Sequence, residues 1–411
     1  MKKYETDLKR NTGSKAGLYI HIPFCIQKCS YCDFFSVKAE HFSDILKGKN
    51  GSLFAKRIAD DIDFFALTYG IREFDSVYVG GGTPSLLSPD DFYFIFSHIL
   101  KRQKIPPVEF TVEINPEDVT EALLEAAFDG GVNRISVGIQ SFSDAVLAAA
   151  KRRGSREKTL TALSRIKKYK TVLSCDLIAG LKNQTYGIIR DDVRTLVDFL
   201  PEHISLYSLC TDKKRNACEE DTVAGLWMYG NDFLERSSYI RYEISNFSYK
   251  NLYKSMHNTK YWKLQNYIGV GPGACGSLFF DHSEKKSAYA VRFSACKNID
   301  KWIFETDRTS VYEYENISNA ECMEEFIMMG FRLIEGINLQ TFTARFGCDI
   351  RDILGGTIKK WRTSGKLLIT DTDIKLTKEG IDFLNKFLQE AFDEIERFLT
   401  GSRREITYDD L

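Results

Sequence analysis

Short β-branched or aromatic runs alternate with longer stretches of helical periodicity over the first two thirds of the chain. These runs predict strands at residues 18–22, 75–79, 110–114, 134–139, 172–178, 203–208 and 240–245. Helices are predicted between them at 53–67, 90–102, 119–128, 158–168, 187–200 and 222–236. Six βα units and a seventh strand favour a partial or complete βα barrel with a parallel sheet, and a doubly wound open sheet is the alternative.

The pattern becomes helix-rich after about residue 281. Helices are predicted at 320–334, 339–346 and 349–364, followed by a hairpin over 366–377 and a closing helix at 378–398. This order is typical of a winged-helix-like unit, whose mixed charge favours a packing or lid role over nucleic-acid binding. The predicted organisation is an N-terminal arm at 1–16, a partial βα barrel with a motif-bearing loop at 17–285, and a helical domain at 286–411.

The composition of the chain predicts its cellular compartment. The chain has 411 residues, and its 56 Lys and Arg nearly cancel its 57 Asp and Glu, so no general nucleic-acid field is expected. No run of about 18 apolar residues occurs, and we expect a cytoplasmic protein with at most peripheral membrane contact. Three of the ten cysteines crowd into one short segment, which favours a metal site over disulfides.

That segment reads HIPFCIQKCSYCDF and places Cys25, Cys29 and Cys32 directly after the first predicted strand. Three thiolates from one loop can hold three irons of a [4Fe–4S] cluster and leave the fourth iron open. An open iron can chelate the amino and carboxylate groups of S-adenosylmethionine (SAM), whose reductive cleavage gives methionine and a 5′-deoxyadenosyl radical. Zinc with one distant ligand and three unrelated buried thiols are the alternatives.

Polar groups also lie at the ends of successive predicted strands. A GGGT run follows the second strand at 80–83, and Glu113, Gln140 and Asp176 lie in the third, fourth and fifth. The carboxyl ends of parallel strands converge on one mouth, where these groups could hold a nucleoside. Taken singly, each of these polar side chains is more often a cap or a loop anchor, whereas the set together with the cysteine loop favours a binding site.

The cysteine loop resembles that of the radical SAM superfamily, and the string YIHIPFC…KCSYCDF is similar to one branch of it. That branch comprises oxygen-independent coproporphyrinogen III dehydrogenase (oxidase) and its heme-chaperone relatives. The resemblance implies a cluster on Cys25, Cys29 and Cys32. It also implies SAM contacts from Tyr19, Gly81, Gly82, Thr83, Glu113, Gln140, Arg152 and Asp176. Around Arg152, the sequence Lys-Arg-Arg departs from the family's usual Gly-Arg-Thr/Ser.

Two features resemble the heme-chaperone branch more than the dehydrogenase. Phe34 stands where the dehydrogenase has a further cysteine, and the arm before the first strand is short. In addition, His257-Asn-Thr-Lys-Tyr261-Trp262 resembles the chaperone motif HNxxYW. The resemblance implies heme contacts from His257, Tyr261 and Trp262, through axial ligation and ring stacking. A packed loop is the alternative.

The resemblance therefore implies a heme chaperone that binds heme and delivers it to apo-proteins, with a cellular electron donor for the cluster. Oxidative decarboxylation of coproporphyrinogen III, or radical chemistry on another substrate, are the competing hypotheses. Cys275 replaces the histidine of the family's GAHS motif, and its role is left open. The sequence also leaves open whether two chains form a homodimer.

Overall fold

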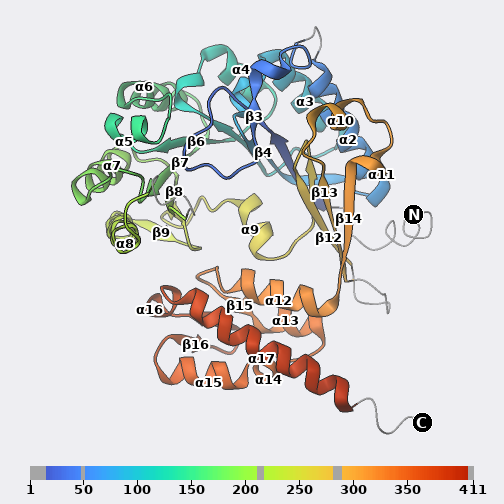
Figure 1. Ribbon diagram of the computed structural model, residues 1–411, viewed down its shortest axis with the longest axis vertical. Helices are drawn as coiled ribbons and strands as arrows, with labels where there is room; N and C mark the ends of the chain where they lie inside the picture. Colours follow the sequence, from blue (N-terminus) through green and yellow to red (C-terminus); the bar gives the residue numbers. More distant parts are fainter. Residues whose placement is uncertain (1–14, 48–50, 211–216, 281–288, 406–411) are drawn as a thin grey trace.

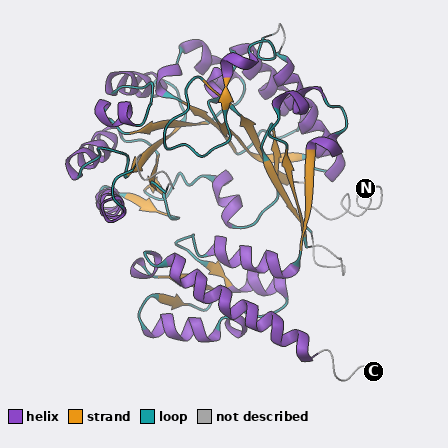
Figure 2. Cartoon of the chain, viewed as in Figure 1, coloured by secondary structure: helices purple, strands orange, loops and turns teal. Residues whose placement is uncertain are grey.

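Figure 1 shows the computed structural model, which describes residues 15–47, 51–210, 217–280 and 289–405. A curved sheet with helices on its outer side forms the larger region, and a smaller helical region follows it (Figure 2). The strand order is β14-β13-β12-β11-β1-β4-β5-β6-β7-β8-β10-β9. Among the described strands, β14 and β9 each have one neighbour, so the barrel is open at one side.

Six of the predicted strands are confirmed as consecutive parallel strands. They are β1 (Lys15–Ile22), β4 (Glu73–Gly81), β5 (Glu109–Ile114), β6 (Arg134–Gln140), β7 (Val172–Ala179) and β8 (His203–Ser208). The helices between them are α2 (Leu53–Tyr69), α3 (Pro89–Arg102), α4 (Glu121–Asp129), α5 (Asp144–Ala149), α6 (Arg156–Ile166), α7 (Tyr186–Phe199) and α8 (Glu220–Arg236). The predicted partial βα barrel is therefore confirmed.

Alternation along each strand separates an apolar face from a polar one. On β4, Val77 and Val79 are buried in the core shared with the outer helices, whereas Ser76 and Tyr78 lie on the opposite face. A βα barrel normally fills its interior with branched apolar side chains. This barrel instead places hydroxyls, carboxylates and imidazoles inside, and each of these groups needs a partner.

The seventh predicted strand, at 240–245, is wrong. This stretch forms the first strand and the turn of a hairpin, β9 (Tyr239–Arg241) and β10 (Asn246–Tyr249), and β10 inserts antiparallel between β8 and β9. The Arg241 guanidinium donates to the carbonyl oxygens of Glu243 and Ile244, at 3.2 and 3.0 Å from Nε. These bonds hold the turn inside the stretch that sequence alone interprets as one continuous strand.

The sheet continues past residue 286, where a domain boundary is expected from the sequence. Four strands extend the sheet beyond β1: β11 (Tyr267–Val270), β12 (Cys275–Phe279), β13 (Ala290–Ala295) and β14 (Tyr312–Ile317). Phe293 of β13 stacks on Phe65 of α2 with ring centroids 4.4 Å apart, so β13 shares the core of the barrel. Two short helices, α10 (Ile299–Phe304) and α11 (Arg308–Val311), connect β13 to β14.

The smaller region has the predicted order of elements. Its helices are α12 (Asn319–Gly330), α13 (Leu339–Phe346), α14 (Ile350–Ile353), α15 (Gly355–Thr363), α16 (Lys378–Ile381) and α17 (Leu384–Glu405). A small sheet orders β15 (Ile337–Asn338), β17 (Asp373–Leu376) and β16 (Leu367–Ile369) as β15-β17-β16. This region has its own core, and none of the described helices has the length and apolarity to cross a membrane.

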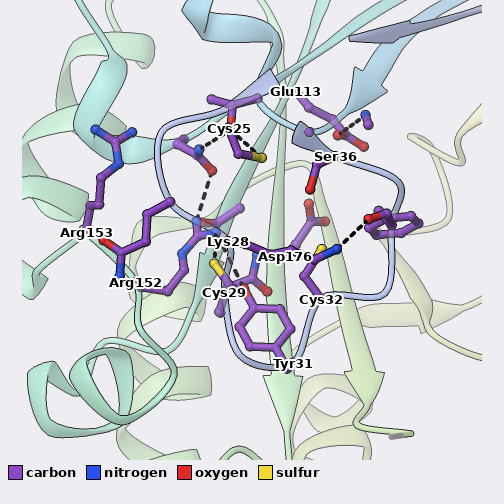
Figure 3. A pocket seen from close by; sticks show the side chains of 18 of the residues that line it. Cys25, Lys28, Cys29, Tyr31, Cys32, Ser36, Glu113, Arg152, Arg153 and Asp176 are labelled. Carbon is purple, nitrogen blue, oxygen red and sulfur yellow. Dashed lines mark hydrogen bonds between the residues drawn. The ribbon is translucent and has the colours of Figure 1, made fainter. Parts of the chain in front are cut away.

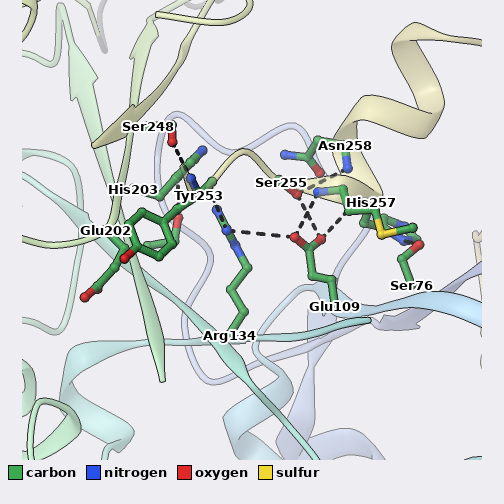
Figure 4. Close-up of polar contacts among 12 residues, drawn as sticks. Ser76, Glu109, Arg134, Glu202, His203, Ser248, Tyr253, Ser255, His257 and Asn258 are labelled. Carbon is green, nitrogen blue, oxygen red and sulfur yellow. Dashed lines mark hydrogen bonds and ion pairs between the residues drawn. The ribbon is translucent and has the colours of Figure 1, made fainter. Parts of the chain in front are cut away.

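A short helix, α9 (Met256–Trp262), lies between the barrel and the smaller region (Figure 1). Glu109, the first residue of β5, accepts hydrogen bonds from Ser255 Oγ at 3.1 Å, Met256 N at 2.8 Å and His257 N at 2.9 Å (Figure 4). Lys260 pairs with Asp75 at 2.8 Å. These partners lie near the amino ends of their strands, so α9 closes that end of the barrel.

We predict that Glu109→Ala lowers the free energy of unfolding by about 3 kcal/mol, because it leaves buried donors of α9 without an acceptor. Chemical denaturation of the full chain measures this change. Glu125→Ala, at an exposed position of α4, should change stability by less than about 0.5 kcal/mol. Equal effects of the two substitutions would show that Glu109 does not anchor α9.

Candidate functional site

A cavity lies at the carboxyl ends of the parallel strands, beneath the cysteine loop (Figure 3). The loop leaves β1 through β2 (Phe24–Cys25) and returns through β3 (Val37–Lys38), which pairs with β2. The cavity has an empty volume of about 1320 Å³, which includes space open to solvent. Its lining includes all three cysteines and the predicted residues Gly81, Gly82, Thr83, Glu113, Gln140, Arg152 and Asp176.

The three cysteines are free thiols, and each is half-buried at the cavity wall. Thr83 Oγ1 lies 3.5 Å from Cys25 Sγ, and Arg152 Nη1 lies 3.9 Å from Cys29 Sγ. Among the described residues, no three Cys, His, Asp or Glu side chains converge to hold a single metal ion. A multi-iron cluster binds each cysteine at a separate iron, so three thiols on one cavity wall could hold one.

The glycine run brings backbone to the cavity wall. Gly81 has a φ of +114°, and a Cβ there would lie 2.6 Å from the His21 ring, so both conformation and space require glycine. Gly82 N donates to Ile22 O at 2.8 Å, which joins the run to the end of β1. The backbone at 81–83 is therefore fixed beside the cysteine loop.

Two carboxylates face the cavity from neighbouring parts of the sheet. Glu113 accepts a hydrogen bond from Tyr78 OH at 2.6 Å and another from Gly81 N at 3.2 Å. Burial raises the pKa of Glu113 to about 7, although the hydrogen bond from Tyr78 opposes the shift. Asp176 accepts from Ser136 Oγ at 3.1 Å, and burial raises its pKa too. Both groups keep acceptor capacity toward the cavity.

Gln140 and Arg152 reach the cavity from irregular backbone. Gln140 has a φ of +69° at a register shift between β6 and β7. This β-bulge lies where Gln140 lines the cavity. Arg152 Nη2 donates to Asn115 Oδ1 at 3.0 Å and to Gly138 O at 2.5 Å. The neighbouring Arg153 pairs with Asp118 at 2.9 Å, so Arg152 is the arginine that approaches the cysteines.

Tyr19 is the one predicted SAM residue outside the described lining of the cavity. Its hydroxyl lies 2.9 Å from His21 Nδ1, and His21 Nε2 donates to Phe35 O at 3.0 Å. The lining residues that sequence reasoning missed include Tyr78, Asn115 and Tyr207. Each lies two residues along the chain from another inward-facing position, and that spacing is the signal that could have identified them.

The predicted heme residues lie at the other end of the barrel. His257 is fully buried on α9, with Nδ1 3.0 Å from Ser76 Oγ and Nε2 2.8 Å from Tyr261 OH. Burial, with a smaller contribution from Lys260, lowers the pKa of His257 to about 3. The Trp262 ring lies under the Arg332 guanidinium of the smaller region, 5.7 Å from its centroid. The structure therefore does not bring these residues into the cysteine cavity.

The Radical SAM superfamily profile matches residues 19–196, and the HemN C-terminal domain profile matches residues 317–383. The heme chaperone HemW of Buchnera aphidicola subsp. Schizaphis graminum is 30% identical over 384 residues, covering 90% of this chain and 97% of that protein. The heme chaperone HemW of Haemophilus influenzae is also 30% identical, covering 90% and 96%. The chain belongs to the HemW family.

The fold of this HemW family member is shared with a solved structure, the coproporphyrinogen III oxidase HemN of Escherichia coli. The two align with a TM-score of 0.79 at 15% identity, covering 95% of this chain and 93% of that one. The radical SAM match implies a [4Fe–4S] cluster and SAM. Three free thiols on one cavity wall, beside a fixed glycine backbone, fit both groups.

The raised pKa of Glu113 predicts a pH-dependent stability for the apo-protein. Between pH 4.5 and about pH 7 the folded state keeps the proton that the unfolded state has lost, so this group's contribution to stability falls as pH rises. Glu113→Gln should remove that fall, and its stability relative to the native chain should increase across this window. Denaturant unfolding at pH 5 and pH 8 measures the free energy of unfolding of both proteins. If the difference between them is the same at both pH values, the raised pKa of Glu113 is contradicted.

Proposed function

We propose that this protein is a radical SAM heme chaperone, which binds heme and delivers it to apo-proteins. The observation that carries the proposal is the 30% identity to proteins named heme chaperone HemW along 90% of this chain. The cavity supports it, because it unites the cysteine loop with all the SAM contacts that the family resemblance implies except Tyr19. A cellular electron donor for the cluster is part of the proposal.

Cys25, Cys29 and Cys32 would hold the cluster, and the cavity beneath them would hold SAM. When bound, these groups supply a radical source or a redox centre. Arg152 directs a guanidinium toward Cys29, so a positive charge lies beside that proposed ligand. Glu113 and Asp176 offer acceptor oxygens to the hydroxyls and ammonium of SAM. Tyr19 contacts His21, whose ring lies against Gly81 of the cavity wall.

The proposed heme contacts at His257, Tyr261 and Trp262 require a change in the position of α9. Both ring nitrogens of His257 are engaged, and Glu109 and Asp75 hold the helix in place. Axial ligation by His257 therefore requires α9 to leave this position. Trp262 is half-buried at the edge of the same helix, where its ring can meet a porphyrin face with less rearrangement.

Substitution of the cysteines tests the cluster. We expect Cys25→Ala, Cys29→Ala and Cys32→Ala each to lose the visible absorbance and most of the iron after anaerobic reconstitution, because three thiolates share one cluster. Cys296→Ala, at a half-buried thiol outside the cavity lining, should retain both. Iron and sulfide analysis decides, and a full cluster in all three variants would refute the ligand set.

Heme titration of the reconstituted chain tests the chaperone. We expect stoichiometric binding, weakened about tenfold by His257→Ala and also by Trp262→Ala. His98→Ala, which removes a side chain 3.2 Å from Asp63 and outside α9, is the matched control. Coproporphyrinogen III incubated with SAM and a reductant should remain unchanged. Decarboxylation of that substrate without heme binding would instead identify a dehydrogenase.

A further inference from the structure

Tyr78 joins the two ends of the barrel. It is a half-buried residue of β4 that lines the cysteine cavity, and its hydroxyl donates to Glu113 Oε1 at 2.6 Å. Its ring stacks on His257 of α9, with centroids 5.4 Å apart and planes at 26°. On another side, the Tyr19 ring lies 6.3 Å away. The ring is thus held in place by α9 and by β1, while its hydroxyl bonds to Glu113 at the cavity.

Glu113 has little freedom once this bond is formed. Its second oxygen, Oε2, accepts from Gly81 N at 3.2 Å, so the carboxylate is held between a side chain and the glycine run of the same strand. Gly80 confirms how close the packing is, since a Cβ there would lie 2.9 Å from both Glu113 Cδ and Tyr78 Cε1. The two donors therefore define one orientation of the carboxylate.

We propose that Tyr78 is a positioning residue, which orients the Glu113 carboxylate for SAM. The proposal rests on the proposed role of Glu113 in SAM binding. Tyr78 does not need to touch SAM for this function. It holds the acceptor before the ligand arrives, so less ordering is required on binding.

A pH signature follows, because a donor to a carboxylate stabilises its charged form. The ionisable groups around Glu113 come from several elements: Tyr78 of β4, Asp176 of β7, Tyr19 of β1, Tyr207 of β8 and Tyr261 of α9. Of these, Tyr78 donates a hydrogen bond to Glu113, while the Asp176 charge disfavours ionisation of Glu113. Loss of the Tyr78 hydroxyl should shift the ionisation of Glu113 to higher pH.

The test is SAM binding to the anaerobically reconstituted full chain by equilibrium dialysis between pH 6 and pH 9. We expect Tyr78→Phe to raise the Kd for SAM about tenfold near pH 7 and to move the pH midpoint of binding upward. The deficit should shrink toward pH 9, where Glu113 is ionised in both proteins. Tyr239→Phe is the matched control, since it removes a buried hydroxyl that donates to Pro201 O at 2.7 Å on the far hairpin. It should bind SAM like the native chain.

The Glu113→Ala variant distinguishes failure of the positioning role from failure of the proposed SAM contact. It also tests whether Tyr78→Phe weakens binding through a general loss of packing. If Tyr78 acts through Glu113, Tyr78→Phe has no further effect on Kd in the Glu113→Ala background. An equal loss in both backgrounds, or a native Kd and pH profile for Tyr78→Phe while Glu113→Ala binds weakly, overturns the positioning role alone. A native Kd for Glu113→Ala overturns the proposed SAM contact itself, together with this inference.

Discussion

Polar and charged side chains inside the barrel can be buried only where each one finds a hydrogen-bond partner. This barrel places Glu109, Arg134 and His203 at the amino ends of its strands. At that end the partners come from the protein itself. They are the start of α9 and the carbonyl of Tyr253 (Figure 4), together with the hydroxyls of Ser174 and Tyr242. The short helix α9 thus supplies hydrogen-bond donors that allow the amino end of this polar barrel to be closed.

The opposite end satisfies the same requirement only in part. Glu113 and Asp176 have donors from the strands, yet both face open space under the cysteine loop. Acceptors with remaining capacity, free thiols and fixed backbone are the features of a site prepared for a ligand. At the amino ends of the strands, Glu109, Arg134 and His203 all have protein partners. At the carboxyl ends, Glu113 and Asp176 still face open space, and the HNxxYW motif is packed away from that cavity.

The sequence predicted the features that depend on local pattern. Six parallel strands, the helices of the smaller region and the cysteine spacing were all visible in periodicity or in one short segment. The hairpin at Tyr239–Tyr249 and the strands β11 to β14 were missed because their identity depends on pairing across the sheet. A spacing of two could have suggested inward positions such as Tyr78 and Asn115, but only the alignment of neighbouring strands shows that they line one cavity.

The HNxxYW motif shows the same limit most clearly. Its sequence resembles a heme motif, but no local feature reveals that His257 meets Ser76, a residue 181 positions earlier in the chain. Aromatic and imidazole groups that suit a porphyrin also suit a packed interior. Both ring nitrogens of His257 are engaged, so the proposed ligation of heme would require this motif to leave its packed position.

Heme transfer is the property that distinguishes a chaperone from an enzyme with the same fold. The decisive measurement loads the reconstituted protein with one equivalent of heme, removes the excess, and follows activation of an apo heme enzyme under anaerobic conditions. The proposed function predicts that acceptor activity appears as heme absorbance leaves this protein, and faster than from free heme. Retention of heme by this protein, or activation no faster than with free heme, would contradict it.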